Sequence, residues 1–166
     1  MRLSPDYYNL PAIELAPLLI GKTLCRKLDD KIIRLRITET EAYCGESDTA
    51  CHAHRGKTPR NSVMYEAGGI AYVYLCYGVH YLLNVICAGE GEPEGVLIRG
   101  LEGISGPGRV TKALQINMDL NREDYKTSDR LWLEDGEPLP FTTTPRIGIK
   151  YANTEDQARL WRFISK

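Results

Sequence analysis

The chain has 166 residues, of which 43% are hydrophobic and 26% are charged. A chain of this length can bury roughly two-thirds of its unfolded surface, and this composition excludes a disordered chain, a collagen-like chain and a small disulfide scaffold. The 21 basic and 22 acidic residues give a formal charge of −1, which taken alone argues against a polyanion-binding surface. No repeat or linker-like stretch divides the sequence, so we expect residues 1–166 to form a single domain.

The five cysteines are odd in number, include no C-x-x-C pair and mostly lie in apolar runs. They predict reduced core thiols rather than a zinc site or a disulfide framework. The first residues lack the apolar segment of a signal peptide, and no stretch approaches the ~18 apolar residues of a membrane span. A cytoplasmic protein is therefore the default expectation. The cysteines are Cys25, Cys44, Cys51, Cys76 and Cys87.

The first predicted elements are a helix and a long strand. The segment from Pro11 to about Ile20 predicts a helix, which Pro17 should bend or shorten and Gly21 should stop. Lys31–Tyr43 then predicts a long strand, bounded by two aspartates before it and by Gly45 after it.

The middle of the chain predicts a loop followed by β structure. Residues 46–69 are polar and rich in turn residues, and an ordered loop of this length is usually functional. Ile70–Tyr77 and Val79–Ile86 predict two strands joined tightly around Gly78 as a hairpin. Gly95–Arg99 predicts a short buried strand of the same kind.

The last third of the chain predicts two more short helices. One begins at Gly106-Pro107-Gly108 and should end near Asn117. Leu131–Leu133 is a short apolar segment, and Thr154-x-x-Gln157 fits a capping box that opens a last helix. We therefore predict an α+β fold, with a central antiparallel β-sheet, a protruding β-hairpin and short helices around it.

Two carboxylates lie on the apolar face of the predicted long strand. Alternation places Glu39 and Glu41 on the same face as Ile33, Leu35 and Ile37. An ionised carboxylate on a buried face is costly unless it is paired or hydrogen-bonded, so at least one should have a partner or a task. A buried ion pair, a strand end that reaches solvent, or a bulge that turns one glutamate outward would explain the pattern without a function. The pattern does not decide which glutamate matters.

Several tyrosines cluster in the predicted hairpin. Tyr72 and Tyr74 share a strand face, and Tyr77 falls at the tip beside Gly78. A structural ladder is the commoner explanation for tyrosines in a strand. A bulky aromatic side chain at a hairpin tip is explained less easily in this way, because such side chains act as wedges between bases or as anchors in partner pockets.

The polar loop offers metal-ligand and cationic side chains. His52 and His54, with Asp48 and Glu41 nearby, have the side-chain types of a metal site, but their spacing matches no common metal motif. The loop's cations suit either phosphate contacts or plain solvation. Common motifs of nucleotide-binding proteins, P-loop proteins, serine hydrolases and zinc peptidases are absent.

Many spaced motifs occur in one order along nearly the whole chain, from Leu19 to Gly148. They are Ile37-Thr38-Glu39-Thr40-Glu41-Ala42-Tyr43, Asp48, His52, Thr58-Pro59-Arg60-Asn61, Tyr72-Val73-Tyr74, Tyr77-Gly78, Asn84, Val96-Leu97-Ile98-Arg99, Gly106-Pro107-Gly108 and Pro145-Arg146-Ile147-Gly148. In these motifs the chain closely resembles the alkyladenine DNA glycosylase family, also called methylpurine or 3-methyladenine DNA glycosylases.

The resemblance implies an enzyme of base excision repair. Such an enzyme flips alkylated or deaminated purines, of the 3-methyladenine, 7-methylguanine or hypoxanthine type, out of duplex DNA and hydrolyses the N-glycosidic bond without a metal or organic cofactor. The resemblance makes Glu41 the base that activates the water, with Arg99 and the backbone carbonyl of Ile147 as further water ligands. The other implied roles are the base sandwich for Tyr43, His52 and Tyr74, discrimination against guanine's amine for Asn84, the wedge for Tyr77, and phosphate contacts for Arg60 and Arg109.

The sequence departs from some family members in one segment. Only Gly100–Ser105, without a lysine or arginine, separates Arg99 from the next Gly-Pro helix start, where some members carry a longer basic segment. No lysine lies in the matched pocket, so we expect no Schiff base and no lyase activity.

Two alternatives remain beside the glycosylase. A non-catalytic nucleic-acid-binding module of the same fold is disfavoured by the intact Glu41 and Arg99. A sugar-processing hydrolase would use Glu39 and Glu41 as a carboxylate pair. For a glycosylase we expect damaged double-stranded DNA as the partner, a monomer, and a location in the cytoplasm, on the nucleoid or in the nucleus. The charge of −1 predicts weak non-specific DNA affinity with a shallow salt dependence.

Overall fold

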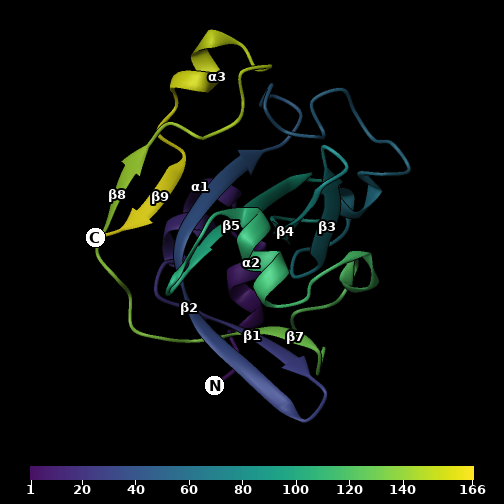
Figure 1. Ribbon diagram of the computed structural model, residues 1–166. Helices are drawn as coiled ribbons and strands as arrows, with labels where there is room; N and C mark the ends of the chain where they lie inside the picture. The colour runs from purple at the N-terminus through teal and green to yellow at the C-terminus, as the bar shows by residue number, and fades with distance from the viewer.

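A computed structural model describes residues 1–166. Nine antiparallel strands form a curled sheet with three helices around it (Figure 1), which confirms the predicted α+β class. The helices are α1 (Ala12–Leu18), α2 (Pro107–Ala113) and α3 (Thr154–Ala158), and short 3-10 turns cover Pro5–Asn9, Ser62–Tyr65 and Met118–Leu120. The strands are β1 (Thr23–Leu28), β2 (Lys31–Cys44), β3 (Ala71–Cys76), β4 (His80–Cys87), β5 (Glu94–Leu101), β6 (Ile104–Ser105), β7 (Leu131–Glu134), β8 (Phe141–Thr144) and β9 (Arg162–Ser165).

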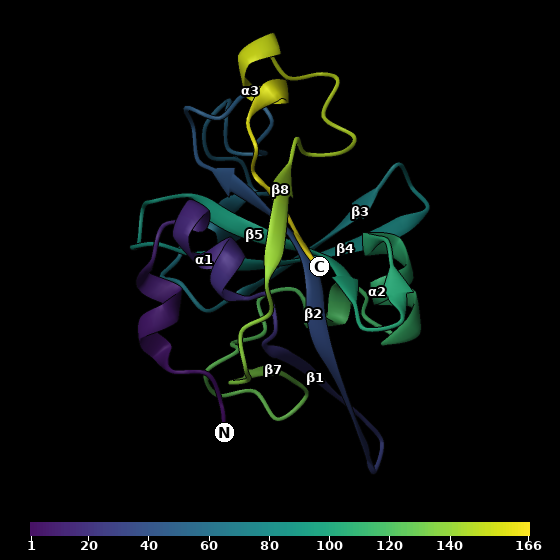
Figure 2. The same ribbon diagram turned by 90° about the vertical axis from the view of Figure 1, so that its left-hand side faces the viewer.

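The long strand β2 organises the sheet. The strand order is β3-β4-β5-β2-β1-β7, with β6 paired to β5 and β8 paired to β9. The first half of β2 pairs with β1, whereas its second half pairs with β5 on one edge and with β9 on the other. The second half of β2 is therefore covered by strands on both edges, and β9 brings the C-terminal part of the chain beside it (Figure 2).

An irregularity in the β2–β5 ladder changes which face of β2 points to the core. The register shifts between Ile37 and Thr40. Ile37 packs in the main hydrophobic cluster, and after the shift it is the even-numbered Ala42 that does so. Glu39 and Glu41 therefore point away from the apolar core. Their predicted place on the apolar face is wrong, because a bulge re-phases the strand, as one of the alternatives allowed.

The first helix begins as predicted and ends at Leu18, two residues before the predicted end, because Pro17 shortens it. Pro11 occupies the N-cap of α1, and Pro17 lies in its last turn, where the helix ends. Gly21 follows with a φ of +97°, and a Cβ atom there would lie 2.3 Å from the carbonyl oxygen of Glu137. Only glycine fits this backbone conformation and this close approach. In Figure 2, α1 and α2 lie on opposite sides of β2.

The other two helices differ from prediction at one end each. Helix α2 ends at Ala113 rather than near Asn117, because Gln115 adopts a left-handed φ of +49° that interrupts the helix. The N-cap of α3 is Asn153, whose side chain accepts a 2.8 Å hydrogen bond from the N–H of Asp156. The predicted capping box at Thr154 is therefore wrong by one position.

The predicted hairpin is confirmed as β3 and β4. The N–H of Val79 donates to the carbonyl of Cys76 at 3.1 Å, and Tyr77 and Gly78 have φ values of +52° and +66°, as a type I′ turn requires. Tyr77 is 89% exposed. A left-handed tyrosine costs of order 1 kcal/mol, so the backbone of the hairpin tip is strained. The exposed Tyr77 side chain gains too little burial to offset this cost.

The apolar side chains form one main core with smaller clusters beside it. The main cluster contains 26 buried residues, and a second cluster of six lies under the loop of residues 46–69. The loop is ordered by turns and by Asn61, whose side chain bonds the backbone of Thr58, His52 and Gly56. None of the helices combines the length and apolar character needed to cross a membrane.

All five cysteines are free thiols, and three are buried. Burial raises the pKa of Cys25 and of Cys44 to about 12 and that of Cys51 to about 11. Burial also raises the pKa of Cys87 well above its ordinary value. These four thiols stay protonated at neutral pH.

Candidate active site

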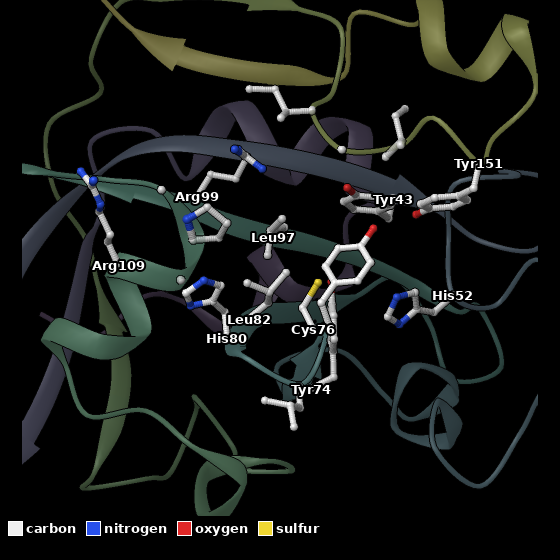
Figure 3. A pocket seen from close by; sticks show the side chains of 18 of the residues that line it. Tyr43, His52, Tyr74, Cys76, His80, Leu82, Leu97, Arg99, Arg109 and Tyr151 are labelled. Atoms are coloured by element: carbon white, nitrogen blue, oxygen red, sulfur yellow. The ribbon is translucent and has the colours of Figure 1, made fainter.

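A cavity of about 780 Å³ opens between the hairpin, the start of α2 and the segment after β8. Three arginines line it, and no aspartate or glutamate does. Figure 3 shows Tyr43, Tyr74 and His52 gathered at one end, with His80 and Arg109 toward the other. The lining therefore joins an aromatic end to a basic end, which suits a polyanion that carries a flat group. The arginines are Arg60, Arg99 and Arg109.

Glu41 is a fully buried carboxylate next to this cavity. Its Oε2 accepts a 2.7 Å hydrogen bond from the N–H of Ile147, and its Oε1 accepts one of 2.9 Å from the hydroxyl of Tyr43. Nη1 of Arg99 lies 3.7 Å from Oε1. All three neighbours line the cavity.

Burial raises the pKa of Glu41, and the charge of Arg99 and the two hydrogen bonds oppose this rise. Burial also keeps the pKa of Tyr43 well above its ordinary value, so its hydroxyl remains a donor. An ionised carboxylate with a raised pKa is a stronger base than an exposed one, which suits the acceptance of a proton from water.

Glu39, two residues before Glu41, has a different environment. Its Oε1 accepts hydrogen bonds from Nε of Arg99 at 2.8 Å and from Nε of Arg162 at 2.5 Å. Arg162 also donates to the hydroxyl of Thr144 at 3.0 Å. Glu39 thus holds Arg99 in place, because one of its carboxylate oxygens is shared by two guanidinium groups. This disfavours the hypothesis of a Glu39–Glu41 acid–base pair.

The predicted base-pocket residues lie around one small inner hollow. Tyr43, His52, Tyr74 and Asn84 all line it. The His52 and Tyr74 rings are 4.4 Å apart between centroids, and the Asn84 amide donates to the carbonyl of Tyr72 at 3.2 Å. The hollow has a volume of about 30 Å³, which has room for water but not for an aromatic base. An aromatic base would therefore enter the hollow only if these side chains separated.

The environment of His52 favours the neutral imidazole. Nδ1 of His52 lies 3.0 Å from the hydroxyl of Tyr72. Partial burial and then the charge of Arg60 lower its pKa, so the ring carries no charge at pH 7.

The candidate DNA-contacting residues surround the mouth of the cavity. Tyr77 projects from the hairpin tip, and Arg109 is exposed in the first turn of α2. Arg60 donates to the carbonyl of Leu75 at 3.1 Å and lies 5.7 Å from the centre of the Tyr74 ring. Arg60 therefore connects the long loop to the hairpin as well as facing the cavity.

The candidate metal ligands do not converge. His52 contacts Tyr72, Nδ1 of His54 contacts the carbonyl of Glu46 at 2.8 Å, and Asp48 pairs with Arg146. The structure contains no group of three or more histidine, cysteine or acidic side chains arranged to hold a metal ion.

Sequence reasoning missed three residues around the site. Arg162 holds Glu39, Arg146 pairs with Asp48 close to Glu41, and Tyr151 lines both the cavity and the inner hollow. All three come from the last 21 residues of the chain. Arg146 lies in a motif of the resemblance, beside Ile147, but was given no role, whereas Arg162 reaches β2 only through the tertiary pairing of β9.

A buried carboxylate beside a cavity with arginine and aromatic walls is the arrangement expected of a hydrolase that acts on a base-bearing polyanion. The model of one family, described as "Methylpurine-DNA glycosylase (MPG)", matches residues 6–166. The chain therefore belongs to the methylpurine-DNA glycosylase family. Membership makes the protein a DNA glycosylase, a hydrolase of DNA repair whose substrate partner is DNA.

Curated relatives agree with the family match. The chain is 44% identical over 174 residues to a protein of Borreliella burgdorferi (strain ZS7), with 96% of this chain and 94% of that protein covered. It is 41% identical over 181 residues to one of Psychrobacter cryohalolentis (90% and 85% covered) and 43% identical over 185 residues to one of Methanocella arvoryzae (99% and 92% covered). Each of the three is named "Putative 3-methyladenine DNA glycosylase".

Proposed function

We propose that the protein is a monomeric, monofunctional glycosylase that flips damaged purines out of double-stranded DNA and hydrolyses their N-glycosidic bond. Its substrates are purines of the 3-methyladenine, 7-methylguanine or hypoxanthine type. The observation that carries the proposal is Glu41, a buried carboxylate held by the N–H of Ile147 and the hydroxyl of Tyr43 beside the arginine-lined cavity.

In the proposed reaction, Glu41 accepts a proton from a water molecule that attacks C1′ of the sugar. The glycosidic bond breaks with its electron pair leaving on the base, and the sugar passes through an oxocarbenium-like state that the carboxylate stabilises. Arg99 and the carbonyl of Ile147 act as further ligands of the water. A cationic alkylated purine leaves directly as a neutral base, whereas hypoxanthine must be protonated as it leaves.

The aromatic end of the cavity holds the flipped base. Tyr43, His52 and Tyr74 stack on its faces, which contributes about 1–3 kcal/mol per base and tolerates different purines. A neutral His52 supports this role, because it does not repel a cationic methylpurine. Asn84 lines the same hollow and discriminates against the exocyclic amine of guanine.

The mouth of the cavity contacts the duplex. Tyr77 fills the space that the flipped nucleotide leaves, and its strained, exposed position at the hairpin tip supports this role. Arg60 and Arg109 contact phosphates. With few such cations around a chain of charge −1, non-specific affinity is weak and depends little on salt.

The proposed enzyme has no lyase activity. Cleavage of the DNA backbone through a Schiff base requires an amine nucleophile at the sugar. No lysine lines the cavity, so the expected product is an intact strand with an abasic site.

Glu41→Gln tests the proposed chemistry. Because the amide cannot accept the proton from water, we expect the single-turnover rate of base release to fall by about 10²–10⁴-fold. Release is measured on duplexes that carry hypoxanthine or an alkylated purine, and lesion binding is measured in parallel. Glu102→Gln, at an exposed carboxylate, is the matched control and should keep the parent rate. Full excision by Glu41→Gln would show that the mechanism is wrong.

Tyr77→Ala tests the wedge. We expect affinity for a lesion duplex to fall by about tenfold, because one stacking contact is lost, whereas Tm should hardly change at an exposed position. Binding is measured by fluorescence anisotropy on lesion and undamaged duplexes. Ile32→Ala, at an exposed apolar residue in the first half of β2, is the control. Equal affinities of Tyr77→Ala and the parent would remove Tyr77 from the DNA interface.

A further inference from the structure

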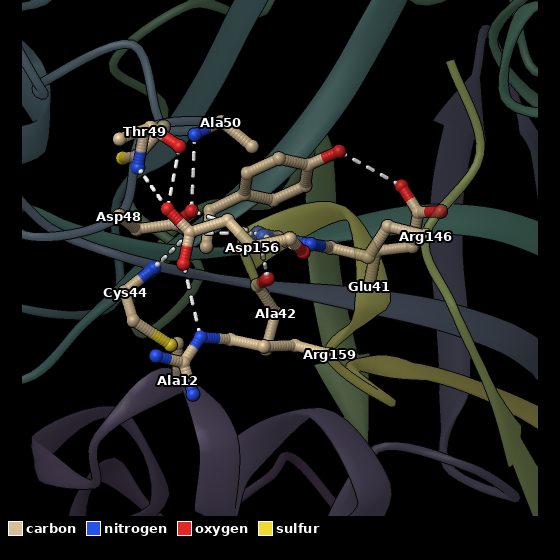
Figure 4. A network of polar contacts seen from close by, with 12 residues as sticks. Ala12, Glu41, Ala42, Cys44, Asp48, Thr49, Ala50, Arg146, Asp156 and Arg159 are labelled. Carbon is tan, nitrogen blue, oxygen red and sulfur yellow. Dashed lines mark hydrogen bonds and ion pairs between the residues drawn. The ribbon is translucent and has the colours of Figure 1, made fainter. Parts of the chain in front are cut away.

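Arg146 is a buried arginine to which the proposed mechanism gives no task. It follows β8 and directly precedes Ile147, and its side chain has no exposed surface. Nη1 and Nη2 donate to the two carboxylate oxygens of Asp48 at 2.6 and 2.9 Å. Nη1 also donates to the carbonyl of Ala42 in β2 at 2.9 Å. Figure 4 shows this network around Asp48 and Arg146.

Asp48 continues the network into the loop that follows β2. Its Oδ2 accepts a hydrogen bond from the N–H of Cys44 and its Oδ1 accepts one from the N–H of Ala50, each at 3.0 Å. The Arg146–Asp48 pair therefore joins the end of β2, the start of the long loop and the segment after β8. These are the parts of the chain that carry Tyr43, His52 and Ile147.

The guanidinium of Arg146 also lies against aromatic rings. Its Cζ atom is 4.9 Å from the ring centre of Tyr43 and 4.9 Å from that of Trp161. Tyr43 lines the cavity and donates to Glu41. A displacement of Arg146 would therefore move the tyrosine ring and, through the next residue, the Ile147 N–H that holds the other oxygen of Glu41.

The arrangement is not the one that stability alone would favour. Nε of Arg146 is buried and has no hydrogen-bond partner, and a buried unsatisfied donor is destabilising. Replacing a buried ion pair by apolar side chains of similar size is often neutral or stabilising. The buried Arg146–Asp48 pair is therefore better explained by the positions in which it holds Tyr43 and Ile147 than by a contribution to stability.

We propose that Arg146, paired with Asp48, is a positioning residue of the glycosylase site. It holds the Tyr43 ring at the face where the base stacks and presents the N–H of Ile147 to Glu41. This inference rests on the proposed function of the same site. The charge of Arg146 also helps to lower the pKa of Glu41 against the effect of burial, which supplies a readout that a purely structural pair would not move.

The test combines Asp48→Leu with Arg146→Met, so that no unpaired charge stays buried. We expect the single-turnover excision rate per folded molecule to fall by about 10–100-fold, because the reacting groups are misplaced. The acid limb of the pH–rate profile should move to higher pH, because the charge of Arg146 lowers the pKa of Glu41, whereas Asp48 is not among the charges that shift it. Arg146→Lys keeps this charge without the bidentate contact, so its rate should fall while its acid limb stays in place. The charged or titratable groups that act on Glu41 are Arg99, Tyr43, Tyr74, Tyr151 and Arg146, and Glu39 reaches it only through Arg99.

Lys22→Met is the matched control for the loss of a buried cation. Lys22 pairs with Asp135 at 2.6 Å and lies 5.5 Å from the ring centre of Tyr7, outside the cavity lining. We expect it to lower Tm but to leave the rate per folded molecule and the acid limb unchanged.

An unchanged rate and acid limb in a folded double variant would overturn the positioning role. If the double variant does not fold, Arg146→Lys decides: a reduced rate supports the role and the parent rate refutes it. Excision that survives Glu41→Gln would instead refute the proposed function itself, so the two failures are distinguishable.

Discussion

The two halves of β2 differ in what covers their faces. In the first half, Ile33 and Leu35 are half-buried against the main core, while Arg34 on the other face pairs with Glu134 near solvent. In the second half, both faces are buried: Ala42 packs in the core, and Glu41 on the other face has no exposed surface. One strand thus passes from a half-exposed surface to a position between the core and the arginine-lined cavity.

The difference shows how one face of a strand can hold two carboxylates of different character. Glu39 is neutralised by two arginines, whereas Glu41 is held by an amide N–H, a hydroxyl and one arginine at a longer distance. Neutral donors restrain a carboxylate without fully compensating its burial. Burial therefore raises the pKa of Glu41 in spite of these partners.

The largest effect on stability is expected from Ile37→Ala, at the last core residue before the bulge. Ile37 is fully buried, so the loss of its side chain should cost about 2–5 kcal/mol in the free energy of unfolding. Ile33→Ala, at a half-buried residue four positions earlier, should cost less. Urea unfolding measures both. Equal losses would show that the two halves of β2 do not differ in packing as described.

A smaller effect is expected from Glu39→Gln. Without the carboxylate, Arg99 and Arg162 lose their common partner, and Arg99 is less well held beside Glu41. We expect the excision rate per folded molecule to fall by about tenfold, equivalent to about 1.4 kcal/mol, and therefore by much less than in Glu41→Gln. Single-turnover assays of both variants on one lesion duplex provide the comparison. A Glu39→Gln variant as inactive as Glu41→Gln would reopen the hypothesis of paired catalytic carboxylates.

The smallest effect concerns the pH dependence of stability. Because burial raises the pKa of Glu41, the folded protein binds this proton more tightly than the unfolded chain does. The resulting stabilisation is present below the unfolded pKa and is lost as pH rises through the folded pKa. Glu41→Gln cannot ionise, so its Tm should exceed that of the parent at neutral pH.

Thermal unfolding between about pH 4 and about pH 8 tests this expectation across the ordinary range of a glutamate pKa. The difference in Tm between Glu41→Gln and the parent should shrink toward the acidic end. Glu102→Gln should show no comparable trend. A parent that is more stable than Glu41→Gln at neutral pH would mean that the hydrogen bonds and Arg99 outweigh the burial of the charge.

The sequence predicts the parts of the fold that depend on local patterns. The long strand, the hairpin and the first helix have strong local signals in their alternation, in Gly78 and in Pro11, and the structure confirms all three. Strand β7 was recognised only as a short apolar segment, and strands β1, β6, β8 and β9 were not predicted. The last two are short and are held by pairing with each other and with β2, which no local pattern reveals.

In the candidate site, too, the residues with a local sequence pattern could be predicted, whereas those placed by tertiary pairing could not. Glu39 and Glu41 stand out because carboxylates interrupt an apolar alternation, but the bulge that turns them away from the core depends on the pairing with β5. The choice of Glu41 over Glu39 came from the family resemblance alone, and the structure adds the different partners of the two groups. Arg146 and Arg162 reach the site from about 100 residues farther along the chain.

The protonated cysteines bear on how the enzyme survives the conditions in which it is needed. Electrophiles that methylate purines also attack thiolates, which are the strongest nucleophiles in most proteins. With the pKa values of Cys25, Cys44, Cys51 and Cys87 raised by burial, few thiolates are present at these positions at neutral pH. Burial therefore withdraws these four thiols from such electrophiles, whereas Cys76 is only half-buried and lines the cavity.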